Sequence, residues 1–127
     1  MAADPTPERI TSLLPHQVFV FGSNGAGAHG GGAARVAHER FGAGWGVGHG
    51  PAGASYAIDT MDGDDALARD AADFLAYAGE HPELEFLLTP VGCGIAGGDP
   101  ARIAPLFRAR PGNVRLPRLF LDALGEA

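Results

Sequence analysis

Short apolar runs alternate with longer segments in which apolar residues recur every three or four positions. Residues 17–21, 55–58 and 84–88 are rich in apolar, β-forming residues, as is typical of strands buried on both faces of a sheet. Each run ends in a polar or glycine-rich loop. The pattern therefore predicts three buried strands.

The helical spacing occurs in three other segments. It predicts amphipathic helices over 32–41, from the acidic turn at 62–65 to about Glu80, and from Asp99 onward. Asp99 and Pro100 predict the N-cap and first residue of the third helix. The apolar stripe of the second helix is Leu67, Ala71, Phe74, Leu75 and Ala78, and that of the third is Ile103, Leu106 and Phe107.

The remaining segments have weaker patterns. Residues 1–16 predict a surface lead-in, with a short helical segment over Glu8–Leu14. Trp45 and Val47 alternate with glycines, which favours a thin exposed strand or hairpin arm. Residues 114–116 and 119–121 are expected to supply a last short strand and terminal packing.

The order of these elements predicts one α/β domain over residues 1–127. Strands alternate with helices, so we expect a layered fold with a mainly parallel sheet and helices on both faces. In such sheets, ligands bind beyond the carboxyl ends of the strands.

Charge and composition exclude several classes of protein. The net charge is −6 and all nine basic residues are arginine, which excludes a Walker A loop and a Schiff-base lysine and argues against nucleic acid as a partner. A single cysteine fits a reducing compartment. No signal peptide or membrane-spanning run is evident, so we expect a cytoplasmic protein without a membrane partner. Neither His38 nor His81 has a partner at metal-ligand spacing, and we expect no metal and no cofactor.

Two glycine-rich loops carry the candidate chemistry. Six of the eleven residues from Gly22 to Gly32 are glycine, and a second loop follows the third strand at 89–98. Glycines allow a phosphate to approach backbone N–H groups closely. Because both loops follow strands of a mainly parallel sheet, we expect them to emerge at one edge and close on one ligand.

Two short motifs in the first loop have other interpretations. Gly25, Gly27 and Gly30 match a dinucleotide fingerprint, but the acidic residue expected about 20 positions later is missing. The segment 29–32 matches a lipase oxyanion loop, although the chain has no G-x-S-x-G nucleophile elbow.

Four blocks in order cover more of the chain than either motif. Residues 19–24, 29–34, 55–58 and 91–97 resemble the signature blocks of macrodomains and their small bacterial and phage relatives. The resemblance implies a three-layer αβα macrodomain-like fold with a mainly parallel or mixed central sheet. It also implies a binding site for ADP-ribose or a related NAD-derived nucleotide.

The resemblance also assigns ligand-binding residues. Asn24 would hydrogen-bond the distal ribose, three glycines would approach that ribose or the nearby phosphate, and the second loop would wrap the diphosphate with backbone N–H groups. The full set is Ser23, Asn24, Gly30, Gly31, Gly32, Gly92, Cys93, Gly94, Ile95, Ala96 and Gly97.

This chain departs from the family at the positions that matter for catalysis. Met61 and Ala96 stand where macrodomain glycohydrolases have a lysine and an aspartate, so a lysine-adduct mechanism is excluded. Hydrolysis of an ADP-ribosyl bond would then need water attack, with Asp59 as base and His29 as acid or orienting donor. Alternatively, Asp59 only caps the end of its strand and His29 only bonds the backbone.

Cys93 also has two interpretations. A thiol beside a phosphate loop can have a lowered pKa. The alternative is a small side chain packed under the loop.

Two other functions stay open at this point. The glycine loops and the Trp45 arm would also suit a non-catalytic interaction or oligomerising protein. The third hypothesis is a different nucleotide-binding enzyme, of the Rossmann-like type.

Overall fold

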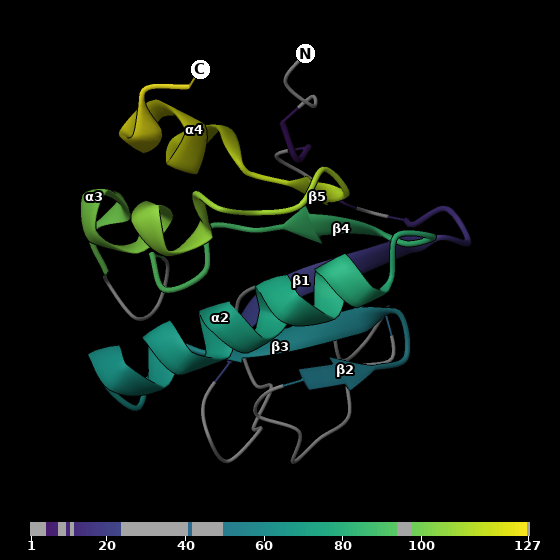
Figure 1. The fold of residues 1–127 in the computed structure, drawn as a ribbon, viewed down its shortest axis with the longest axis horizontal. Helices are drawn as coiled ribbons and strands as arrows, with labels where there is room; N and C mark the ends of the chain where they lie inside the picture. The colour runs from purple at the N-terminus through teal and green to yellow at the C-terminus, as the bar shows by residue number, and fades with distance from the viewer. Residues whose placement is uncertain are drawn as a thin grey trace.

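The structure is a computed structural model that describes residues 5–7, 10, 12–23, 41, 50–93 and 98–126. In this part of the chain, a five-stranded sheet has the order β2-β3-β1-β4-β5 (Figure 1). The strands are β1 Gln17–Ser23, β2 Gly50–Ala52, β3 Ser55–Asp59, β4 Glu85–Leu88 and β5 Val114–Arg115.

The central strand β1 sets the direction of the sheet. It runs parallel to β3 and to β4, with Val20 opposite Tyr56 on one side and Leu88 on the other. β5 is parallel to β4, and β2 is antiparallel to β3. The predicted α/β class with a mainly parallel, mixed sheet is confirmed. The carboxyl ends of β1, β3 and β4 consequently lie at one edge.

The described helices cover one face of this sheet, as Figure 1 shows for the long helix α2 in front of β3 and β1. They are α2 Asp64–Glu80, α3 Pro100–Ile103, the 3-10 helix η1 Ala104–Phe107 and α4 Arg118–Leu124. The predicted stripe of α2 faces the sheet, with Phe74 fully buried against Tyr56, Phe86 and Phe107. Asp99 caps α3 as predicted, since its side chain accepts a hydrogen bond from the Ala101 N–H.

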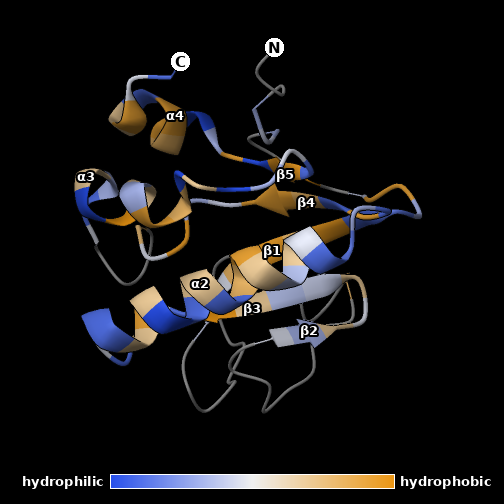
Figure 2. Cartoon of the chain, in the orientation of Figure 1, coloured by the Kyte–Doolittle hydropathy of each residue, from blue (hydrophilic) through white to orange (hydrophobic). Residues whose placement is uncertain are grey.

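The opposite face of the sheet carries a second apolar cluster. Successive residues of β1 point to opposite faces, so Phe19 and Phe21 lie on this side while Val18 and Val20 join the helices. Figure 2 shows the resulting hydrophobic colouring along β1 and β4. Phe41 packs on Phe19 with ring centroids 4.9 Å apart. The remainder of the helix predicted over 32–41 lies outside the described residues, as does the predicted arm at 42–49.

Two predictions of local structure need correction. β1 extends two residues beyond the predicted end at Phe21, because its pairing with β3 continues through Gly22 and Ser23. Residues 119–121 lie in the helix α4, which the sequence analysis did not predict. Its ends carry ordinary helix signals, Pro117 before the first turn and Gly125 in the left-handed conformation after the last.

The lead-in is tied to the far edge of the sheet. Thr6 forms an isolated bridge with Pro117, and its hydroxyl donates to the Arg115 carbonyl over 2.7 Å. Within the described residues, no helix is long and apolar enough to cross a membrane.

Candidate functional site

The carboxyl ends of β1 and β3 lie side by side. Ser23 is opposite Asp59 in the parallel register, and both residues are buried. The next residue, Thr60, donates its backbone N–H to the Ser23 carbonyl over 2.9 Å, and its hydroxyl donates to the same oxygen over 3.2 Å. The point where β1 gives way to the first glycine loop is therefore bound directly to the end of β3.

The second loop begins in the same way on the other side of β1. Thr89, just after β4, donates both its N–H and its hydroxyl to the Val20 carbonyl, over 3.1 and 2.8 Å. Gly92 then adopts a left-handed conformation with φ +78°. The carbonyl of Gly92 accepts a 2.6 Å hydrogen bond from the Gly98 N–H, which closes the base of the loop around residues 93–97.

The starting points of the two loops lie close together. A Cβ added to Gly22 would lie 3.4 Å from the backbone nitrogen of Gly92 and 3.0 Å from the hydroxyl oxygen of Thr60. A Cβ added to Gly92 would meet Thr60 Cγ2 at 3.7 Å. The prediction that both loops leave the same edge is confirmed for these anchoring residues.

Most of the predicted site residues lie beyond what the structure describes. Ser23, Asp59, Gly92 and Cys93 are placed, and of these Ser23, Asp59 and Gly92 are brought to the junction of the loops. The residues outside the described part of the chain are Asn24, His29, Gly30, Gly31, Gly32, Gly94, Ile95, Ala96 and Gly97. Their proposed roles stay predictions.

Asp59 has the contacts of a strand-end cap. Its Oδ1 accepts a 3.1 Å hydrogen bond from the Met61 N–H, and its own N–H donates to Asp70 Oδ2 over 3.0 Å. Burial raises the pKa of Asp59, a hydrogen bond with Asp62 raises it further, and the Met61 N–H partly offsets both effects. This geometry matches the capping interpretation, while a raised pKa also suits a general base. The catalytic role of Asp59 stays a prediction.

Cys93 has the contacts of a packed side chain. Its side chain is partly buried against the main core, where its thiol lies 3.7 Å from the Val91 carbonyl. Burial raises the pKa of this thiol, and the negative charge of Asp99 raises it further. The suggestion of a lowered pKa is therefore wrong, and the packing interpretation describes the residue.

The sequence analysis missed two threonines that organise this edge. Thr60 and Thr89 each follow a strand that pairs with β1, and each holds a carbonyl of β1 with two donors. A threonine within two residues of the end of each of two predicted strands was visible in the sequence. The role of these threonines could not be predicted, because the pattern did not show that both strands neighbour β1.

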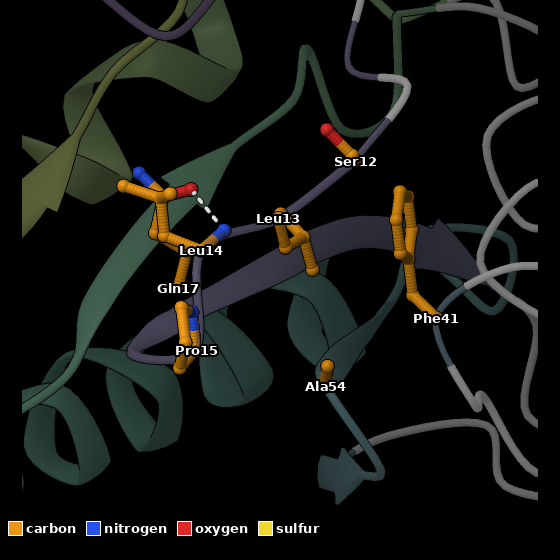
Figure 3. A pocket seen from close by; sticks show the side chains of 7 residues that line it. All are labelled: Ser12, Leu13, Leu14, Pro15, Gln17, Phe41 and Ala54. Carbon is orange, nitrogen blue, oxygen red and sulfur yellow. Dashed lines mark hydrogen bonds between the residues drawn. The ribbon is translucent and has the colours of Figure 1, made fainter.

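A separate pocket of about 560 Å³ lies at the opposite edge, where β1 begins and β3 is about to begin (Figure 3). Its lining is mostly apolar, with Leu13, Leu14 and Phe41 among the contributing side chains. It shares no residue with the predicted site. In the described residues, no group of three or more histidine, cysteine, aspartate or glutamate side chains is arranged to hold a metal ion.

In the comparisons with known proteins, no family model, no curated protein and no solved structure matches this chain. What the fold and the edge define is an α/β protein with two adjoining loops at the carboxyl ends of parallel strands.

Proposed function

We propose that this chain binds ADP-ribose or a related NAD-derived nucleotide at the carboxyl edge of the sheet. The observation that supports the proposal is the proximity of the two loop origins: a Cβ on Gly22 would lie 3.4 Å from the Gly92 nitrogen, and Thr60 lies beside both glycines. A ligand with a central diphosphate can contact both loops at once. The resemblance of the four sequence blocks to macrodomains supplies the identity of that ligand.

The chemistry of the chain suits an anion held by neutral groups. Neither glycine-rich segment, 22–32 or 89–98, contains a lysine or an arginine, so these segments would bind a diphosphate through oriented backbone N–H groups. Left-handed Gly92 at the base of the second loop allows the chain to turn sharply, and its missing Cβ leaves room for Ile103 Cδ1.

The proposal is for binding, with hydrolysis of an ADP-ribosyl bond as an extension of it. Asp59, the candidate base, lies at the end of β3 next to Ser23, and its raised pKa brings it closer to the range useful for proton transfer. His29 would supply the acid or orienting donor.

Isothermal titration calorimetry with ADP-ribose, AMP and NAD tests the binding proposal. We expect heat with ADP-ribose and weaker or no heat with AMP. Absence of heat at about millimolar ADP-ribose, where binding weaker than roughly −4 kcal/mol would be missed, overturns the proposal.

A pair of charge-matched variants locates the site. Gly31→Glu should abolish binding, because the resemblance places Gly31 against the ligand and the new carboxylate would repel a diphosphate. Gly112→Glu adds the same charge in the turn before β5, where an added Cβ meets nothing within 4 Å. It should bind as the unmodified chain does. Equal affinity of both variants would show that the ligand binds elsewhere.

A further inference from the structure

Thr60 is in contact with both loop origins. Its two donors converge on the Ser23 carbonyl, the last carbonyl of β1. Its methyl carbon Cγ2 lies 3.1 Å from where a Cβ of Gly22 would be and 3.7 Å from where a Cβ of Gly92 would be. One side chain thus fills the space that the two glycines leave at the junction.

We propose that Thr60 is a positioning residue for the nucleotide site, setting the separation between the end of β1 and the turn at Gly92. This inference rests on the proposed function. Thr60 acts through its neighbours: the hydroxyl holds the Ser23 carbonyl at the end of β1, and the methyl group lies beside Gly92.

The two halves of the side chain have separable roles. Without the hydroxyl, the Ser23 carbonyl keeps the Thr60 N–H as a donor, so β1 and β3 stay paired while the end of β1 loses one of its two restraints. The stability cost is then that of one ordinary hydrogen bond. Loss of this hydroxyl should weaken ligand binding more than loss of a hydroxyl far from the site. The reason is that a ligand held by two loops requires both loops at the correct separation.

Thr60→Val removes the hydroxyl and keeps the shape, whereas Thr60→Ser keeps the hydroxyl and removes the methyl group. The matched control is Thr6→Val, because the Thr6 hydroxyl also donates to a backbone carbonyl and Thr6 is buried, but β1, β4 and β5 separate it from Thr60. Melting temperature and calorimetric affinity for ADP-ribose are measured for all three variants and the unmodified chain.

We expect Thr60→Val and Thr6→Val to lose similar amounts of thermal stability. Thr60→Val should also weaken ADP-ribose binding roughly five- to tenfold, the equivalent of about one hydrogen bond, while Thr6→Val leaves affinity unchanged. Thr60→Ser should recover most of that affinity. If the unmodified chain binds and Thr60→Val binds equally well, Thr60 is structural only and the inference fails. If the unmodified chain does not bind ADP-ribose, the proposed function itself fails.

Discussion

The close approach of Ile103 to Gly92 gives the sharpest test of how the start of the second loop packs on α3. Gly92 has φ +78°, and a Cβ on it would lie 2.8 Å from Ile103 Cδ1. Ile103 is buried at the end of α3, so its side chain has little room to move. Gly92→Ala therefore combines a strained backbone with an overlap in the core.

The two costs can be estimated separately. A left-handed conformation costs a residue with a Cβ about 1–2 kcal/mol. Ordinary carbon–carbon contacts lie at about 3.5–4.0 Å, so Ile103 must shift, and overpacking of this kind costs about 1–3 kcal/mol. Gly92→Ala should thus lower the free energy of unfolding by roughly 2–5 kcal/mol.

A double-mutant cycle with Ile103→Val separates these contributions. Valine lacks Cδ1, and by itself the substitution should cost about 0.5–1.5 kcal/mol. In the Gly92→Ala background it should cost less or even stabilise, giving a coupling of roughly 1–2 kcal/mol, whereas the backbone strain remains. Urea unfolding followed by circular dichroism measures all four chains.

Gly98→Ala is the matched control. Its Cβ would meet Ile103 Cδ1 at 2.6 Å, but it would also meet the carbonyl oxygen of Gly92 at 2.5 Å. Shortening Ile103 cannot relieve an overlap with the backbone, so Gly98→Ala should stay nearly as destabilising in the Ile103→Val background. Additivity of Gly92→Ala and Ile103→Val within about 0.5 kcal/mol would refute the close packing of Gly92 against Ile103.

Two further predictions concern charges at this edge. Because the pKa of Asp59 is raised on folding, the folded chain holds its proton more tightly, and the contribution of Asp59 to stability falls as pH rises from its ordinary pKa of 3.8 through the raised value. Asp59→Asn can keep the hydrogen bond from the Met61 N–H. In urea unfolding, the stability of this variant relative to the unmodified chain should therefore be higher at about pH 7 than at about pH 4. The reverse order would contradict a raised pKa for Asp59. Asp99→Asn should keep the cap of α3 and lower the pKa of Cys93, seen as faster thiol alkylation at a given pH, whereas Asp99→Ala should also cost about 1 kcal/mol of stability. Unchanged alkylation in Asp99→Asn would show that burial alone sets the pKa of Cys93.

The sequence predicted those features that depend on local pattern. The apolar runs gave β1, β3 and β4 to within two residues, and the three- and four-residue spacing gave α2 with its buried stripe. Asp99 followed by Pro100 gave the start of α3. These elements follow from burial, helix capping and the fixed geometry of proline, all of which act over a few neighbouring residues.

Features that depend on tertiary contacts were missed. β1 continues through Gly22 and Ser23 because β3 offers them partners, and no local propensity favours a strand there. The pKa of Cys93 rises because the thiol packs against the core, and the sequence alone could not decide between this packing and a lowered pKa beside a phosphate loop. For β1, the deciding interaction is the pairing with β3, more than thirty residues away in the sequence.

The same distinction explains how far the candidate site was predictable. Parallel strands place both glycine loops at the carboxyl edge of the sheet, whatever the order of the strands. The sequence was sufficient to predict this placement. Adjacency depends on the strand order: β1 and β4 are neighbours, so their loops begin about one strand spacing apart, ~4.8 Å. An intervening strand would have doubled that separation and put Gly22 out of reach of Gly92. A Cβ at Gly22 would be crowded by Thr60, and a Cβ at Gly92 by Ile103, so both positions favour glycine. A site that binds one diphosphate from two sides would therefore depend on the strand order as much as on the glycines themselves.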